Sequence, residues 1–70
     1  MTKVAIKTPE IRLDALMKFS GMCQTGGQAK ILIQEGQVFV NGTACLQRTK
    51  KIHVGDVVSY ATQTVEVTGS

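Results

Sequence analysis

The sequence predicts an α+β fold in which two short helices precede a small antiparallel β-sheet. Apolar residues in the first half of the chain recur at intervals of three and four, which is the period of an amphipathic helix. In the second half they alternate in short runs separated by tight-turn signals, which is typical of antiparallel strands. The 70 residues suffice for one small domain, 1–70, and leave no room for a deep enzyme cleft.

The first two elements are a strand and a helix. Residues 2–7 alternate in polarity, which predicts a short edge strand that ends before Pro9. Within residues 12–19 the apolar positions follow the helical period, which predicts an amphipathic two-turn helix that stops at Gly21. The apolar positions are Val4 and Ile6 in the strand and Leu13, Leu16 and Met17 in the helix.

The second helix and the hairpin after it carry the clearest local signals. Thr25 and Gln28 form a capping-box pattern, in which the Thr25 hydroxyl accepts a hydrogen bond from a backbone N–H and the Gln28 amide reaches back to the cap. Gly36 suits the left-handed conformation that ends a helix. Asn41-Gly42 is the strongest two-residue signal for a type I′ hairpin. The apolar stripe of this helix consists of Ala29, Leu32 and Ile33.

Alternating apolar residues predict the strands of the sheet. Ile52 and Val54 are expected on one face, with His53 between them facing solvent, before a second turn signal at Gly55-Asp56. The predicted strands cover residues 38–40, 43–46, 52–54, 57–60 and 65–67.

The balance of charge favours a polyanionic partner. Eight Lys or Arg residues against five Asp or Glu give a net charge of +3 and a pI of about 9.1. Arg48, Lys50 and Lys51 fall within one loop, and the strand before that loop carries no acidic residue. A local basic patch is therefore expected there.

The start of the second helix is a second candidate anion site. Gly26 and Gly27 leave backbone N–H groups unobstructed at the positive end of the helix dipole, and Lys30 is expected on the solvent side beside them. Arg12 and Lys18, at the two ends of the first helix, extend this surface. The acidic residues Glu35, Asp56 and Glu66 are expected away from it, so that charges of opposite sign are segregated.

Two plainer interpretations stand beside the electrostatic one. A short Lys and Arg cluster in a loop is more often solvated surface, so its spacing alone does not establish nucleic-acid binding. Packing explains the aromatic residues Phe19 and Tyr60 more simply than base stacking does. Phe39 points away from Val38 and Val40 and is the one candidate stacking platform, although partial burial is the more common outcome for such a residue.

No pattern of catalytic or metal-binding residues is present in the sequence. Cys23, Cys45 and His53 lack the spacings of familiar zinc sites, and no nucleophile, histidine and acid set is legible. We therefore expect no metal, no cofactor, no small-molecule substrate and no enzymatic activity. Residues 1–7 are too short and too charged for a secretory signal, and no apolar run reaches membrane-spanning length, so a cytoplasmic protein with reduced thiols is expected.

The motifs, taken in order, resemble a known RNA-binding family. They are Arg12-Leu-Asp14…Leu16, Thr25-x-x-Gln28-Ala29-Lys30-x-Leu32-Ile33, Gly36-x-Val38-x-Val40-Asn41-Gly42 and Gly55-Asp56-Val57. Together they resemble the domain named after ribosomal protein S-four, the S-four domain, over about residues 12–60. A chain that is only this domain is similar to the stand-alone bacterial YbcJ/YaaA type.

The resemblance implies a fold, a function and a set of RNA-binding residues. The fold is two short helices packed on a small curved antiparallel sheet, and the function is non-enzymatic binding of structured RNA, such as ribosomal RNA. Separately from the resemblance we expect a monomer, although the sequence does not determine the oligomeric state. A protein-interaction adapter is the alternative. Where many family members carry Ser-Arg, this chain has Thr25-Gly26, so one basic side chain of the RNA face is missing. The expected RNA-binding residues are Arg12, Thr25, Gly26, Gly27, Gln28, Lys30, Arg48, Lys50 and Lys51.

Overall fold

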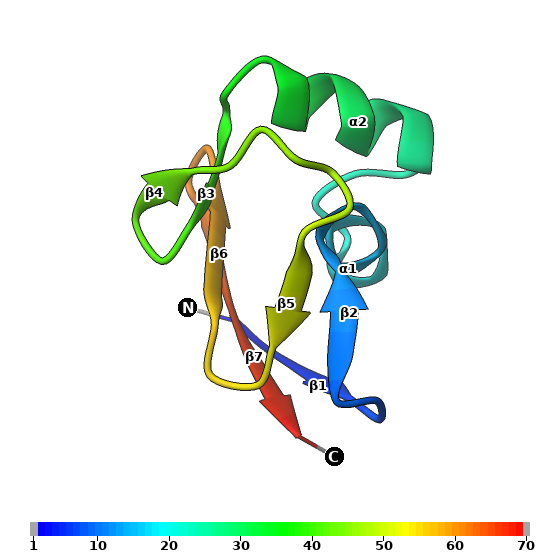
Figure 1. The fold of residues 1–70 in the computed structure, drawn as a ribbon, viewed down its shortest axis with the longest axis vertical. Helices are drawn as coiled ribbons and strands as arrows, with labels where there is room; N and C mark the ends of the chain where they lie inside the picture. Colours follow the sequence, from blue (N-terminus) through cyan, green and yellow to red (C-terminus); the bar gives the residue numbers. More distant parts are fainter. Residues whose placement is uncertain (1, 70) are drawn as a thin grey trace.

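The computed structural model describes residues 2–69, and it places two helices against a five-stranded sheet and a separate two-stranded ribbon (Figure 1). The helices are α1 (Leu13–Ser20) and α2 (Gly26–Gln34). The strands are β1 (Thr2–Ile6), β2 (Glu10–Arg12), β3 (Val38–Val40), β4 (Thr43–Ala44), β5 (Lys51–His53), β6 (Val57–Tyr60) and β7 (Gln63–Gly69). The predicted α+β class and its two helices are confirmed.

The five-stranded sheet has the order β1-β7-β6-β3-β4 and is mixed. The pairs β7–β6, β6–β3 and β3–β4 are all antiparallel, as predicted. Strand β1 lies at the edge, also as predicted, but it pairs parallel with β7. A parallel neighbour needs a long connection, and almost the whole chain, including both helices, lies between these two strands.

The ribbon of β2 and β5 differs from the prediction. The residues around Ile52 were expected in the main sheet, but β5 pairs antiparallel with β2, a strand that the sequence did not reveal because it has three residues. Ile11 lies opposite Ile52 in this ribbon, and Ile52 is fully buried. Val54 was expected on the same face, yet it lies beyond the end of β5 and is 54% exposed, so that prediction is wrong.

Helix α2 begins at its predicted cap, and both helices end at or just before the predicted glycines. The Thr25 hydroxyl accepts a hydrogen bond from the N–H of Gln28 (3.1 Å). The Gln28 side chain in turn accepts from the N–H of Gln24 (3.0 Å), one residue before the cap rather than at the cap itself. Gly21 and Gly36 follow the two helices with φ values of 86° and 76°, in the left-handed region.

The Asn41-Gly42 turn is also confirmed. Asn41 has a φ of 52° and Gly42 a φ of 85°, which are the two positive values that a type I′ turn requires. This turn joins β3 to β4, although β4 is shorter than the predicted strand over residues 43–46.

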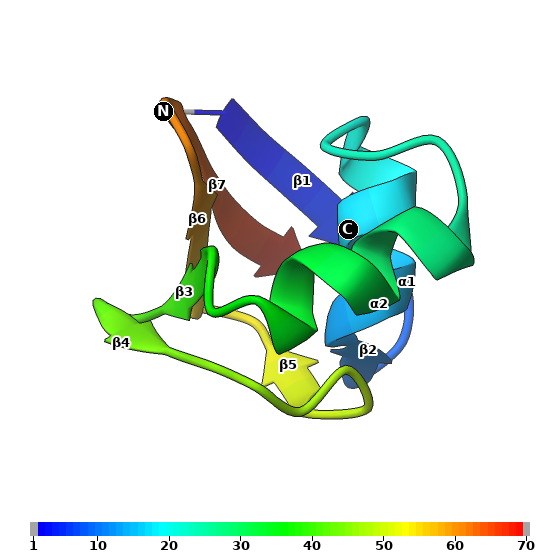
Figure 2. The ribbon, with the colours of Figure 1, turned by 90° about the horizontal axis from the view of Figure 1, so that it is seen from above.

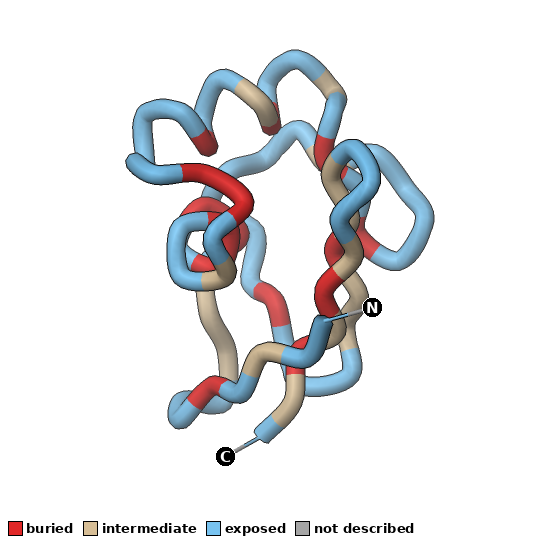
Figure 3. Tube along the Cα trace, turned by 180° about the vertical axis from the view of Figure 1, so that it is seen from behind, coloured by how far each residue is buried: buried red, intermediate tan, exposed pale blue. Residues whose placement is uncertain are grey.

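One core joins the helices, the sheet and the ribbon. Figure 2 shows both helices on one side of the five-stranded sheet, and Figure 3 shows buried positions on the inner side of α2 and exposed positions on its outer side. Tyr60 packs against this core, as expected, but Phe19 is 66% exposed, so the prediction that packing explains it is wrong. The largest fully buried side chains are Leu13, Leu16, Met17, Ile33, Val38, Ile52, Val58 and Val67. Within residues 2–69, no helix is long and apolar enough to cross a membrane.

Candidate nucleic-acid interface

The start of α1 holds the basic loop in place through backbone hydrogen bonds. The N–H of Leu13 donates to the carbonyl of Lys50 (2.9 Å), and the N–H of Asp14 donates to the carbonyl of Arg48 (3.1 Å). These two N–H groups belong to the first turn of a helix and have no partner within it, so the loop satisfies them. The remote loop is thereby fixed against the helix start.

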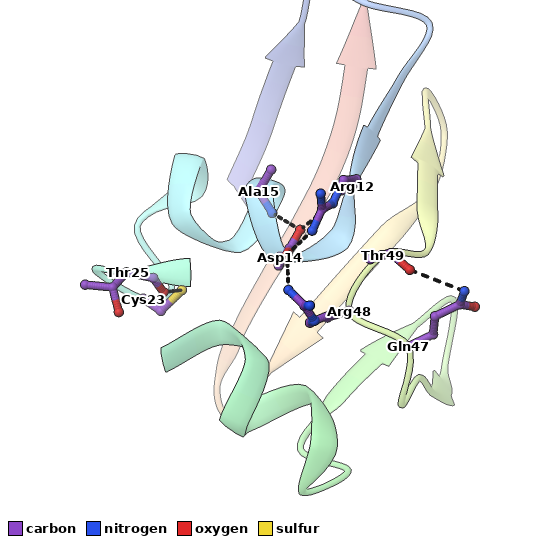
Figure 4. A network of polar contacts seen from close by, with 8 residues as sticks. All are labelled: Arg12, Asp14, Ala15, Cys23, Thr25, Gln47, Arg48 and Thr49. Carbon is purple, nitrogen blue, oxygen red and sulfur yellow. Dashed lines mark hydrogen bonds and ion pairs between the residues drawn. The ribbon is translucent and has the colours of Figure 1, made fainter. Parts of the chain in front are cut away.

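Strand pairing adds two more cations to the same place. In the β2–β5 ribbon, Arg12 lies directly opposite Lys51. Four of the sequence-predicted residues therefore meet on one surface, which we call the basic cluster: Arg12, Arg48, Lys50 and Lys51. The loop from residue 47 to residue 50 passes close to α1, as Figure 4 shows.

A buried carboxylate lies within the basic cluster. The Oδ1 and Oδ2 atoms of Asp14 accept hydrogen bonds from Nε (3.2 Å) and Nη2 (2.7 Å) of Arg12, and Nη1 of Arg48 lies 3.8 Å from Oδ2 (Figure 4). Oδ1 also accepts from the N–H of Ala15 (2.8 Å). Asp14 is the acidic residue in the first turn of α1, and it is also the centre of this ion-pair network.

A second carboxylate lies at the other end of the cluster. Nζ of Lys51 is 2.7 Å from a carboxylate oxygen of Glu10, and Nε2 of His53 is 3.9 Å from the other oxygen. The hydrogen bond from Lys51 lowers the pKa of Glu10 below its ordinary value, and the charges of Lys51 and His53 act in the same direction. The predicted segregation of charge is therefore wrong in part, because Glu10 and Asp14 lie among the cations.

Two shallow hollows connect the basic cluster with the start of α2. One, of about 590 Å³, is lined by Arg12, Gln47, Thr49, Lys50, Lys51 and His53. The other, of about 210 Å³, is lined by Arg12, Asp14, Ala15, Lys18 and Gly26. Since Arg12 lines both, one continuous surface runs from the basic loop to the first residue of α2. Lys18, which the sequence placed beside this surface, lies on it.

The start of α2 is open to an approaching group. Gly26 and Gly27 are exposed, and a Cβ atom built on Gly26 would meet no atom within 4 Å. Thr25 and Gln28 are exposed too, but their side chains are engaged in the cap. Upstream, Sγ of Cys23 lies 3.4 Å from the carbonyl of Thr25 (Figure 4), and burial raises the pKa of this thiol.

Lys30 stands apart from the other predicted residues. It is exposed on α2, as expected. Among the contacts that residues 2–69 make, none links Lys30 to the basic cluster.

Besides Lys18, three ionisable residues of this surface, Glu10, Asp14 and His53, were not among the predicted binding residues. Glu10 lies beside Lys51 because β2 pairs with β5. Asp14 lies beside Arg12, two residues before it in the sequence. His53 follows Lys51 by two positions on β5, so both side chains share the solvent face of the strand, and that spacing was a usable signal. Within residues 2–69, no three His, Cys, Asp or Glu side chains gather in a way that could hold a metal ion.

Comparison with known proteins decides the family. The model of the S4 domain, the S-four domain named above, matches residues 4–68. The chain belongs to the S4 domain family. The match extends beyond the residues 12–60 that carry the sequence resemblance and includes part of β1 and most of β7.

Relatives in two bacteria are similar over most of their length. YbcJ of Escherichia coli, named as a candidate RNA-binding protein, is 43% identical over 61 residues, which are 87% of each chain. RlbA of Bacillus subtilis, named as a probable ribosome maturation protein, is 38% identical over 55 residues, 79% of this chain and 78% of RlbA. The solution structure of YbcJ superimposes with a TM-score of 0.76 at 38% identity, over 99% of this S4 domain chain and 89% of the YbcJ chain. That structure was reported to reveal an alfaL motif involved in RNA binding.

Proposed function

We propose that this S4 domain protein is a non-enzymatic RNA-binding module that recognises structured RNA, with ribosomal RNA or a ribosome assembly intermediate as its target. Family membership supports RNA as the ligand class, and the names of YbcJ and RlbA support RNA binding and a ribosomal context. The proposed binding residues are those expected from the sequence, with Lys18 added because it lines the same surface.

The observation that carries the proposal is the continuity of the cationic surface. Arg12 connects the hollow at Lys50 and Lys51 with the hollow at Lys18 and Gly26. Phosphates of a folded RNA would bind along this path, to guanidinium and ammonium groups at one end and to backbone N–H groups at the other. Contacts of this kind read the shape of an RNA more than its bases, so we expect modest sequence specificity.

The first test measures how RNA affinity depends on salt. Binding of a labelled RNA stem-loop should weaken linearly with log salt concentration, with a slope that corresponds to about three to five phosphate contacts. The double variant Lys50→Glu/Lys51→Glu should weaken binding and reduce the slope by about one to two contacts. A slope near zero would show that phosphate contacts do not drive binding.

A matched control separates the cluster from net charge. Lys3 is exposed and is the second residue of β1. The N-terminal end of β1 lies away from β5 in Figures 1 and 2. Lys3→Glu changes the net charge as the single variant Lys50→Glu does, and half as much as the double variant does. It should nevertheless leave RNA affinity within about twofold, because screening limits the reach of a distant exposed charge. If both changes weaken binding equally, the interface lies elsewhere.

The start of α2 is tested by a second pair of variants. Gly26→Glu should weaken RNA binding by charge repulsion at the proposed phosphate site, and the fold should persist because the space around Gly26 is open. Gly26→Ala adds a Cβ without a charge and should bind RNA nearly as the wild type does. Equal affinities of both folded variants would remove this helix start from the interface.

A protein-interaction adapter is the second candidate, and one observation favours it. Phe19 is 66% exposed and lines a largely apolar hollow of about 440 Å³ with Ala5, Ile6, Lys7, Thr8, Ile11 and Ala15. Exposed apolar hollows of this kind often mark protein contacts. A chain that binds no RNA stem-loop at low salt would make the adapter the leading hypothesis.

A further inference from the structure

We propose that Asp14 is a positioning residue of the candidate interface: its carboxylate fixes the directions of Arg12 and Arg48, so that the surface selects folded RNA over flexible single strands. This inference rests on the proposed RNA-binding function and adds to it a residue that determines specificity.

Asp14 is itself held rigidly. The residue is 8% exposed, and the N–H of Ala15 donates to its Oδ1 atom (2.8 Å), so the carboxylate has a fixed orientation at the start of α1. The backbone N–H of Asp14 donates to the carbonyl of Arg48, and this hydrogen bond anchors the loop that carries the second arginine. One residue therefore connects the helix, the ribbon and the basic loop.

The two arginines are held at one edge and open at the other. Arg12 meets the carboxylate through both Nε and Nη2, which is the bidentate geometry that fixes a guanidinium plane. The side chains of Arg12 and Arg48 are nevertheless 51% and 46% exposed. A guanidinium has five N–H donors, so the groups that do not contact Asp14 remain for phosphate oxygens.

The carboxylate lowers the general attraction of this surface for polyanions, because it offsets part of the positive charge. A helix-start charge explains an acidic residue at this position, but it does not explain a bidentate pair with one arginine and a contact with a second from a distant loop. Ordering of the two side chains does explain both. A long side chain that is already ordered loses less conformational entropy when it binds phosphate.

Arginine side chains that are already ordered should bind a folded RNA more tightly than a flexible one. A folded RNA presents its phosphates at fixed positions. The fixed guanidinium of Arg12, with Arg48 beside it on a loop anchored to Asp14, matches that spacing with little further loss of freedom. A flexible strand adapts equally well to fixed or mobile arginines and so gains little from the constraint. Removal of the constraint should therefore reduce affinity for folded RNA and leave affinity for flexible RNA unchanged or higher.

Glu10 offers a matched control on the same surface. Its pair with Lys51 is a single contact to an ammonium group, and both side chains are well exposed. Glu10→Gln and Asp14→Asn each remove one negative charge from the basic cluster. Only Asp14→Asn also disrupts the bidentate pair, because the Asn amide N–H groups face the donors of Arg12.

The experiment compares the affinities of two labelled probes, an RNA stem-loop and an oligouridine of the same length, by fluorescence anisotropy in one buffer. The ratio of stem-loop to oligouridine affinity should fall about tenfold in Asp14→Asn, the effect of one charge-assisted contact. In Glu10→Gln both affinities should rise together, with the ratio unchanged. Arg12→Lys keeps the charge and the Asp14 carboxylate but loses the bidentate geometry, so it should lower the ratio as well.

Thermal melts followed by circular dichroism establish that each variant is folded, and Arg12→Lys decides the matter if Asp14→Asn does not fold. An unchanged ratio in the folded variants, or an equal fall in Glu10→Gln, overturns the positioning role while the RNA-binding function stands. A wild type that binds neither probe overturns the proposed function and the inference with it.

Discussion

At the scale of single residues, Asn41 and Asp56 hold two turns of the sheet together. Asn41 donates from Nδ2 to Asp56 (3.2 Å) and accepts from the N–H of Val57 (2.9 Å), which links the β3–β4 turn to the start of β6. Asp56 also accepts from the N–H of His53 (2.8 Å) at the end of β5. Residues that suit turns by their backbone preferences therefore also connect turns that lie far apart in the sequence.

The charge of Asp56 should make stability depend on acid pH. Partial burial raises the pKa of Asp56, but the hydrogen bonds from His53 and Asn41 and the charges of His53 and Lys50 outweigh it and lower the pKa below the ordinary value of 3.8. Because the pKa of Asp56 is lower in the folded state than in the unfolded state, its charge stabilises the fold at pH values above the unfolded-state pKa. This contribution is lost as the pH falls through the folded-state pKa.

Comparison of wild type with Asp56→Asn tests this effect. At neutral pH the variant should melt at a lower temperature, and the difference should shrink as the pH falls below about 4, where the carboxylate of the wild type becomes protonated. Melting followed by circular dichroism between neutral pH and about pH 2 measures it. A difference in melting temperature between wild type and Asp56→Asn that stays constant over the whole pH range would contradict the prediction.

At the scale of elements, capping determines where α2 begins. Thr25 and Gln28 satisfy donors at the helix start, and the exposed glycines that follow them contribute little helix propensity of their own. A helix of nine residues with such a start depends on its cap and on the burial of Ala29 and Ile33.

Thr25→Ala should lower the free energy of unfolding by about 1 kcal/mol, because it removes the acceptor for the Gln28 N–H. Urea denaturation at neutral pH measures the change. Thr62→Ala, at an exposed position in the β6–β7 turn, is the matched control and should change stability by less than about 0.5 kcal/mol. If the cap contributes nothing to stability, Thr25→Ala and Thr62→Ala will have the same free energy of unfolding.

At the scale of the whole molecule, a single core attaches the β2–β5 ribbon to the rest. Ile52 is the fully buried residue of β5, and it joins the same cluster as residues of both helices and the main sheet. Since the ribbon positions Arg12 and Lys51, the core determines the geometry of the basic cluster as well as the stability of the fold.

Ile52→Ala should therefore lower stability by about 2–5 kcal/mol, the usual effect of a large-to-small change in a core. This is a large part of the total for a domain of this size, at about 0.05–0.15 kcal/mol per residue. Val54→Ala, two residues on, should have little effect because Val54 is exposed. Urea denaturation of both variants measures the contrast, and similar midpoints would show that β5 contributes little to the core.

By itself, the sequence determined the local features of this protein. The first helix was expected over residues 12–19 and lies at Leu13–Ser20. This helix, the cap at Thr25, the glycine stops and the Asn41-Gly42 turn all follow from residue types within a few positions of one another, because backbone preference and capping act at that range. The same short motifs, in order, were enough to indicate the family that the comparison then showed.

Tertiary structure decided what depends on distant pairing. The β2–β5 ribbon, the parallel edge strand and the exposure of Phe19 and Val54 follow from how remote segments meet, and a three-residue strand carries too few positions to show a period. Among the predicted binding residues, the fold brought Arg12, Arg48, Lys50 and Lys51 together and also placed Asp14 and Glu10 among them. Charge along a chain becomes charge on a surface only through packing, because that is what sets the distances on which Coulomb interactions depend.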